Sequence, residues 1–145
     1  MATTNKVSIQ KFVEHLSLRP LSCKDKLKEK SITQSDINRP ALQLAGFFDY
    51  FDHHRVQIIG QVEYTFMEKQ GMEKSVEMME KIMSYKVPCI VFCRDIPVYE
   101  RFLELSEQFA VPILSTPAET SSFSAEVTRW LRVELAPCIS IHGVL

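Results

Sequence analysis

The feature that most constrains the fold is an alternation of short apolar runs with longer amphipathic segments from residue 56 onward. Three runs have the length and aliphatic content of buried strands: residues 56–60 (VQIIG), 88–93 (PCIVFC) and 112–115 (PILS). The segments between them carry apolar residues at helical spacing, at residues 62–70, 72–84 and 97–109. A strand–helix–strand order requires right-handed crossovers. We therefore predict an α/β fold with a largely parallel sheet flanked by helices.

Capping patterns predict where the later helices begin. Asp95 is expected to cap one helix, with Pro97 in its first turn. Thr116, Pro117 and Glu119 match a capping box with proline at the first helical position, which predicts a last helix running to about residue 135. A single stripe is expected to form the buried face of the helix at residues 72–84: Met72, Val76, Met79 and Met83.

The first fifty residues are expected to add a helix and an edge strand to this sheet. Ser8 is placed to cap the first helix. Pro40 suits a helix start and Gly46 a helix end. A chain of 145 residues has the size of one domain. We therefore expect one α/β domain over residues 1–135, followed by a strand or linker over residues 136–145.

Charge and hydropathy narrow the class of protein. The 17 basic and 18 acidic residues give a net charge of −1, which disfavours a nucleic acid partner. No run approaches the roughly 18 apolar residues of a membrane span, and residues 1–11 lack the apolar core of a signal peptide. These features predict a cytoplasmic protein without a membrane or nucleic acid partner.

Cysteine and glycine usage limits the chemistry. Cys89 and Cys93 lie in one predicted strand, about 13 Å apart, too far for a disulfide. With Cys23 and Cys138 they are predicted to be free thiols of a cytosolic protein. The four glycines cannot form a phosphate-binding loop of the G-x-x-x-x-G-K-[ST] type. We therefore predict no cofactor site within this chain.

Four groups of residues are candidate sites. His53 and His54, near Asp49 and Asp52, have metal-ligand chemistry, but adjacent histidines in a loop point apart, and we favour an exposed turn and no metal site. The turn at residues 35–39, with Ser35, Asp36 and Arg39, could bind an anion or a partner loop, or serve only as a turn. The aromatic segment FFDYF, residues 47–51, could be a binding patch or pack under a helix.

His142 is the last candidate. It follows a predicted strand and precedes Gly143, with no visible catalytic partner.

Several segments together resemble the amino-terminal region of bacterial HPr kinase/phosphorylase. They are ITQSDINRPALQLAGFFDYF at residues 32–51, RVQIIG at 55–60, PCIVFCRD at 88–95 and APCISIHGVL at 136–145. They occur in the family's order and cover nearly the whole chain. The resemblance implies a domain similar to the substrate-binding domain of Mur ligases, although such a likeness of fold carries no function with it.

The resemblance also implies an activity for the full-length protein. That family phosphorylates a serine of the phosphocarrier HPr with ATP or pyrophosphate and magnesium. It reverses the reaction by phosphorolysis, and so controls carbon catabolite repression. Its members are homo-hexamers, and their kinase domain follows the amino-terminal domain. Residues 136–145 would then lead into a kinase domain, and this chain alone would be inactive and without a cofactor.

The same resemblance assigns a role to His142. The family's catalytic histidine lies in the I-H-G-V block, which maps onto His142 as a group near the transferred phosphoryl. Two other functions remain open. One is a stand-alone module that binds a small phosphorylated metabolite or a partner protein. The other is a thiol redox sensor, which would need a reactive thiol with a low pKa.

Overall fold

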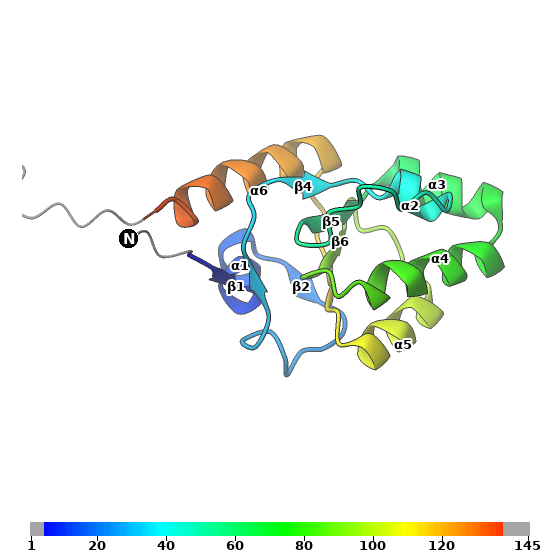
Figure 1. The fold of residues 1–145 in the computed structure, drawn as a ribbon, viewed down its shortest axis with the longest axis horizontal. Coiled ribbons are helices and arrows are strands. Elements are labelled where there is room, and N and C mark those ends of the chain that lie inside the picture. The colour runs from blue at the N-terminus through cyan, green and yellow to red at the C-terminus, as the bar shows by residue number, and fades with distance from the viewer. Residues whose placement is uncertain (1–4, 138–145) are drawn as a thin grey trace, which may run out of the picture.

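A five-stranded sheet forms the centre of the molecule (Figure 1). The computed structural model describes residues 5–137. The sheet order is β2 (Arg19–Pro20), β7 (Ile113–Ser115), β6 (Ile90–Phe92), β5 (Val56–Ile59) and β4 (Ile37–Asn38). β4 to β7 are parallel, and β2 is antiparallel to β7. A separate antiparallel pair joins β1 (Val7–Ser8) to β3 (Ser31–Ile32). This topology confirms the predicted α/β class.

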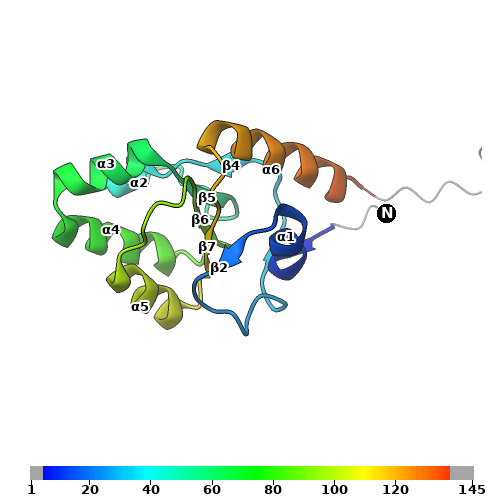
Figure 2. The ribbon, with the colours of Figure 1, turned by 180° about the vertical axis from the view of Figure 1, so that it is seen from behind.

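Helices cover both faces of the sheet (Figures 1 and 2). On one side lie α2 (Ala41–Leu44), α3 (Gln61–Gln70), α4 (Met72–Ser84) and α5 (Glu100–Phe109). On the other lie α1 (Ile9–Leu16) and α6 (Thr120–Glu134). Alternate strand residues serve the two layers, as Val91 packs toward α1 and α6 while Ile90 and Phe92 pack toward α4 and α5. Burial on both faces explains why these strands are almost wholly apolar.

Several sequence predictions hold. Ser8 caps α1, since its Oγ accepts from the Lys11 backbone N–H at 3.1 Å. Pro40 immediately precedes α2, and Gly46, with φ 104°, follows its end. In α4, Met79 and Met83 are buried as expected. The centre of the buried face is shifted, however: Ser75, Met78 and Ile82 are buried with them, while Met72 and Val76 are partly buried.

The predicted capping role of Asp95 is wrong. α5 begins at Glu100, preceded by Tyr99, and residues 96–99 form no helix. Arg94 and Asp95 both have positive φ, 60° and 52°, in a turn directly after β6. Their N–H groups donate to the carbonyls of Ala118 and Thr116, each at 3.0 Å. The backbone of Asp95 is thus held by the neighbouring β7–α6 connection, and cannot adopt the extended conformation of a helix cap.

The predicted capping box at residue 116 is also wrong. α6 begins at Thr120, with Glu119 as its N-cap residue and without a side-chain cap. Thr116 directly follows β7 and is held beside β6, since its N–H donates to the Phe92 carbonyl at 3.0 Å. Its Oγ1 accepts from the Ala118 N–H at 3.3 Å, which closes a turn ahead of the helix. The helix therefore starts about one turn later than the pattern predicted.

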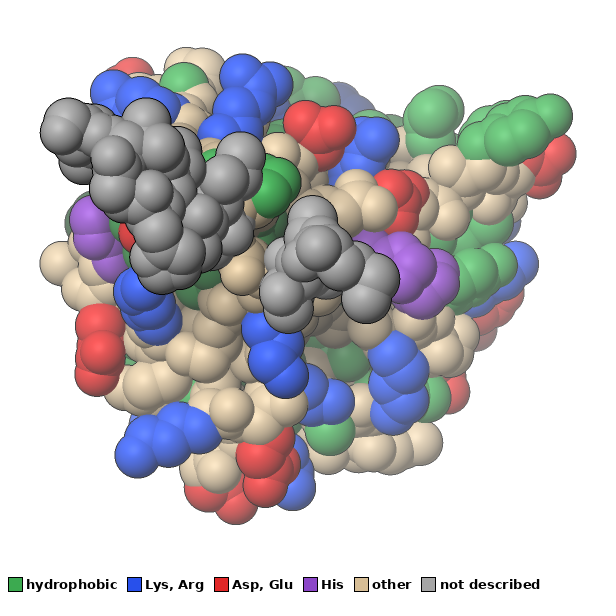
Figure 3. Space-filling model, turned by 60° about the vertical axis from the view of Figure 1, so that its left-hand side comes forward, with side chains coloured by type: hydrophobic (Ala, Val, Ile, Leu, Met, Phe, Trp, Pro, Cys, Tyr) green, Lys and Arg blue, Asp and Glu red, His purple; other side chains and the backbone are tan. Residues whose placement is uncertain are grey.

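Other features agree with a folded domain that has free thiols. Cys23, Cys89 and Cys93 are buried and unpaired, whereas Cys138 lies outside the described residues. Among residues 5–137, no helix combines the length and the hydropathy that crossing a bilayer requires. On the face that carries α1 and the end of α6, basic and acidic side chains are interspersed (Figure 3).

Candidate functional site

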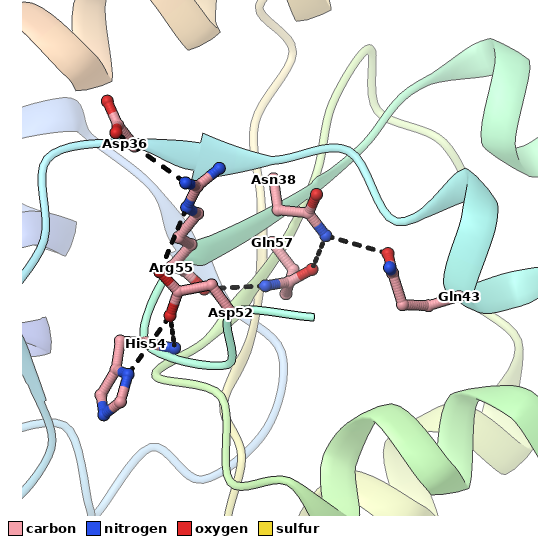
Figure 4. A network of polar contacts seen from close by, with 7 residues as sticks. All are labelled: Asp36, Asn38, Gln43, Asp52, His54, Arg55 and Gln57. Carbon is pink, nitrogen blue, oxygen red and sulfur yellow. Dashed lines mark hydrogen bonds and ion pairs between the residues drawn. The ribbon is translucent and has the colours of Figure 1, made fainter. Parts of the chain in front are cut away.

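Three side-chain amides connect β4, β5 and α2 at one edge of the sheet (Figure 4). Asn38 Nδ2 donates to Gln57 Oε1 at 2.7 Å and to Gln43 Oε1 at 3.1 Å. Gln57 is fully buried within β5, and its Nε2 donates to the Arg55 carbonyl at 2.8 Å. A buried amide needs such partners. The network therefore holds the two-residue strand β4 and the start of α2 in place.

An ionic cluster adjoins this network (Figure 4). Arg55 precedes β5, and its Nε lies 3.4 Å from Asp52 Oδ2, while its Nη2 lies 4.0 Å from Asp36 Oδ2. The Nε atom is buried and makes no hydrogen bond within the described residues. Asp52 Oδ1 accepts from the His54 N–H at 3.0 Å and lies 3.2 Å from His54 Nδ1. Asp52 thus joins the 52–55 turn to the arginine.

The surroundings of Asp52 favour its ionised form. Desolvation by itself would raise the pKa of this carboxyl. Hydrogen bonds from the His54 backbone and side chain and from Gln34, together with the Arg55 charge, outweigh it and hold the pKa below its usual value. Asp52 is therefore a carboxylate at neutral pH, fixed within its own turn.

The aromatic segment 47–51 divides into a packed and an exposed part. Phe48 stacks on Tyr85 of the α4 C-terminus, with ring centroids 5.4 Å apart, and Phe51 meets both rings edge-on. Phe47 is 48% exposed, and Tyr50 is fully exposed with φ 61°. Each of the two predictions for this segment therefore holds for different residues: Phe48 and Phe51 are partly buried and pack against the core, while Phe47 and Tyr50 face solvent.

A pocket of about 320 Å³ is lined both by exposed aromatic side chains and by members of the polar network. Phe47 and Tyr50 line it, together with Asn38, Asp52 and Arg55. We call this the amide–aromatic pocket. Its volume is at the lower end of small-ligand sites. Apolar rings beside a guanidinium and a carboxylate suit the recognition of a partner side chain.

The turn at residues 35–39 does not act as one unit. Asp36 contacts Arg55 at the amide–aromatic pocket, whereas Arg39 turns toward α3. Its Nε and Nη2 donate to Glu63 Oε1 at 3.1 and 2.7 Å. No hydrogen bond of the Ser35 side chain occurs among the residues that the structure describes. The predicted polar turn at residues 35–39 is therefore wrong, because Ile37 and Asn38 form strand β4 beside β5. The charged residues on either side of this strand serve two different places.

The expectation that the two loop histidines point apart is wrong, since their ring centroids lie 4.2 Å apart. His54 is engaged with Asp52, and the described residues contain no group of three or more His, Cys, Asp or Glu side chains placed to hold a metal. His142, the residue with a predicted catalytic role, lies outside the described residues, as does the strand expected over residues 138–141.

Sequence reasoning missed the buried polar side chains that build the site. Gln57 and Glu63 are 0% and 3% exposed, and Gln43 is 5% exposed. One signal was available for Gln57, because a single amide within the apolar run VQII must find a partner when the strand is buried. Glu63 gave no such signal, since position 63 is an ordinary place for a glutamate on an amphipathic helix.

Comparison with known proteins identifies the family. The family model described as HPr Serine kinase N terminus matches residues 7–131. The chain belongs to the HPr kinase/phosphorylase family. It is 55% identical over 139 residues to the HPr kinase/phosphorylase of Lachnoclostridium phytofermentans and 34% identical over 140 residues to that of Bacillus subtilis. These alignments cover 96% and 97% of this chain, and the predicted family resemblance is thereby confirmed.

The family relatives are longer than this chain, which spans 45% of the length of both. A structural comparison adds the fold. The CBS and DRTGG domains of the regulatory region of Clostridium perfringens pyrophosphatase, solved with diadenosine tetraphosphate, match with a TM-score of 0.60 and 12% identity. The match covers 95% of this chain and 52% of that one. It supports the α/β architecture, while the likeness to Mur ligases stays a prediction.

Proposed function

We propose that this chain is the assembly and regulatory domain at the amino terminus of a bifunctional HPr kinase/phosphorylase. The full-length protein would phosphorylate a serine of HPr with ATP or pyrophosphate and magnesium, and would remove the phosphate by phosphorolysis. The observation that carries this proposal is the 55% identity over 139 residues to a named HPr kinase/phosphorylase. Family membership favours it over a stand-alone binding module, the alternative from the sequence.

The catalytic parts are proposed to lie outside residues 1–145. Phosphoryl transfer needs a loop that cradles phosphates and groups that hold magnesium. The sequence has four glycines and no G-x-x-x-x-G-K-[ST] motif, which supports an inactive isolated chain. His142 keeps its proposed role near the transferred phosphoryl only in the context of the complete enzyme.

The amide–aromatic pocket is the proposed contact of this domain with another subunit. Exposed Phe47 and Tyr50 beside Arg55 have the composition of an interface core, where aromatic residues and arginine are enriched. A homo-hexamer in the cytoplasm, as the family resemblance implies, would provide such a subunit. HPr itself would be bound by the catalytic part of the protein.

A paired phosphorylation assay tests this function. The complete product of the native gene and the 145-residue chain are incubated separately with HPr, ATP and magnesium, and phosphoserine on HPr is measured by intact mass. We expect phosphoserine with the complete product and none with the 145-residue chain. Two results would contradict the proposal: absence of phosphoserine in both reactions, or formation of phosphoserine in the reaction with the 145-residue chain.

A further inference from the structure

A second hollow lies at the carboxyl ends of the parallel strands, apart from the amide–aromatic pocket. Its volume is about 220 Å³. The residues around it follow three strands or begin α6: Arg39 after β4, Gln61 after β5, Arg94 after β6, and Thr120. Open α/β sheets bind ligands at this edge, where successive connections pass to opposite faces. Here α3 leaves toward one layer and α6 toward the other (Figures 1 and 2).

Two guanidinium groups line this hollow, which we call the carboxyl-edge hollow. Glu63 Oε1 fixes Arg39 through Nε and Nη2, and no described hydrogen bond uses the Arg39 Nη1. Arg94 is exposed, and its side chain makes no ion pair or hydrogen bond among residues 5–137. The negative charge of Glu63 offsets the positive charge of Arg39, and the negative charge of the exposed Glu119 offsets that of Arg94. Binding of an anion here must therefore depend on the positions of the hydrogen-bond donors rather than on net charge.

The first residues of two helices line the same hollow. α3 has 10 residues and α6 has 15, and in neither helix does the side chain of the N-cap residue bond to the first turn. At the start of α3 the Glu63 carboxylate accepts from the Gly60 N–H, so the later N–H groups of that turn are the ones left for a ligand. The first N–H groups of an uncapped helix lack intrahelical partners and carry a partial positive charge. Gln61 and Val62 of α3 and Thr120 and Ser121 of α6 line the hollow. Two helix starts and two guanidinium groups therefore converge on one small volume.

A close backbone approach makes this convergence possible. A Cβ on Gly60 would lie 3.0 Å from Arg39 Nη2 and closer still to the Thr120 side chain. Thr120 is 8% exposed, and its side chain lies directly against Gly60. Glycine at position 60 thus lets the start of α3 meet the start of α6 and the guanidinium of Arg39.

We propose that the carboxyl-edge hollow binds a phosphate group, either inorganic phosphate or the phosphoryl group of a small ester. A tetrahedral anion matches the combination of guanidinium forks, helix N–H groups and hydroxyls. At about 220 Å³ the hollow is smaller than a typical site for a drug-sized ligand, so it would enclose the phosphoryl group and leave an esterified remainder outside. This site is independent of catalysis and goes beyond the proposed function.

Titration of the 145-residue chain followed by amide NMR tests the site. Sodium phosphate and glycerol 3-phosphate are added separately at constant ionic strength, with sodium chloride as the blank. We expect saturable shifts of the Gln61, Val62 and Ser121 amides, with half-saturation below about 10 mM. Tighter binding of the ester would identify an esterified ligand, and equal binding would identify phosphate itself; both support the site.

Arg94→Gln is the informative variant, because its side chain makes no contact that the fold requires. It should weaken phosphate binding about tenfold. Arg129→Gln is the matched control, because it also removes one positive charge. Arg129 lies on α6 about 13 Å along the helix from Thr120, so this variant should leave the affinity for phosphate unchanged. No saturable shift up to about 20 mM phosphate, or equal loss of affinity in both variants, would overturn the proposal.

Discussion

At the scale of single residues, Glu63 carries more of the structure than its place on a surface helix suggests. Its carboxylate is 3% exposed and accepts from Arg39 and from the Gly60 N–H at 2.7 Å. A buried carboxylate with these partners joins β4, the β5–α3 turn and α3. Removing its charge would leave Arg39 and the Gly60 N–H without their shared acceptor.

Glu63→Gln should therefore lower the free energy of unfolding by about 2 kcal/mol, because a half-buried ion pair loses one partner. Urea unfolding followed by circular dichroism measures this change. Glu68→Gln, at an exposed position of the same helix, is the matched control and should stay within about 0.5 kcal/mol of the parent chain. A loss of the same size in both variants would contradict a special role for Glu63.

The thiols offer a second prediction at this scale. Burial raises the pKa of Cys93 to about 11 and raises those of Cys89 and Cys23 as well. Thiolate is the reactive form, so these three thiols should resist an alkylating reagent at about pH 7.5 in the folded chain and react after unfolding. Peptide mass spectrometry locates the label. Rapid labelling of Cys93 in the folded chain would revive the redox-sensor hypothesis.

Asp52 predicts how stability depends on pH. Its pKa is lower in the folded chain than in the unfolded chain, so it stabilises the fold above about pH 4, and this contribution is lost as pH falls through the folded value. Asp52→Asn should reduce the loss of stability between about pH 5 and pH 3, measured as urea midpoints. An identical pH dependence in parent and variant would show that its partners do not stabilise the charged form.

At the scale of elements, the approach of α3 to α6 is a packing constraint centred on Gly60. Its φ of −116° is open to any residue, so alanine would meet no backbone strain. The obstacle is steric, because the new Cβ would overlap the Thr120 side chain. The constraint therefore belongs to the contact between two elements rather than to the turn.

Gly60→Ala should destabilise the chain by about 2 kcal/mol through overpacking. Thr120→Ala removes the two atoms nearest to the new methyl group and leaves the contact with Arg39 Nη2, so the double variant should be less destabilised than the sum of the single variants. A double-mutant cycle on urea unfolding gives the coupling, expected at about 1 kcal/mol in the favourable direction. Additive losses would contradict the contact between Gly60 and Thr120.

The elements also show what sequence alone can predict. Periodicity located β5, β6, β7 and α4, because burial on both faces or on one stripe leaves a pattern in the residues themselves. The starts of α5 and α6 were missed, because the backbone of residues 94–95 bonds to the carbonyls of residues 116 and 118. A local capping pattern does not reveal such a contact between distant segments.

At the scale of the whole molecule, the alternation of strands and helices predicts that β5, β6 and β7 run parallel, but it does not predict which strands form the edges of the sheet. The first forty residues supply both edges, β2 beside β7 and β4 beside β5. The candidate site was predicted only in outline: residues 35–39 and 47–51 were singled out, while Gln43 and Gln57, which connect them, were not. Long-range polar contacts of this kind depend on the assembled fold.

The exposed aromatic residues give a prediction for the complete enzyme. Tyr50→Ala should leave the stability of the 145-residue chain within about 0.5 kcal/mol, since the ring is fully exposed. In the complete gene product it should weaken assembly about tenfold, as expected for an interface aromatic. Sedimentation velocity of the complete gene product compares Tyr50→Ala with the control Tyr99→Ala, which changes an exposed tyrosine elsewhere on the surface. Unchanged assembly for Tyr50→Ala would remove the amide–aromatic pocket from the subunit interface.

The central claim is that this chain is a domain of a kinase without the kinase's nucleotide site. Titration of the 145-residue chain with a fluorescent ATP analogue, with and without magnesium, tests it most directly. We predict no magnesium-dependent binding tighter than about 1 mM, because the chain lacks a phosphate loop. Weak binding at the carboxyl-edge hollow would differ, since it needs no magnesium and inorganic phosphate would compete with it. Micromolar, magnesium-dependent binding would contradict the account.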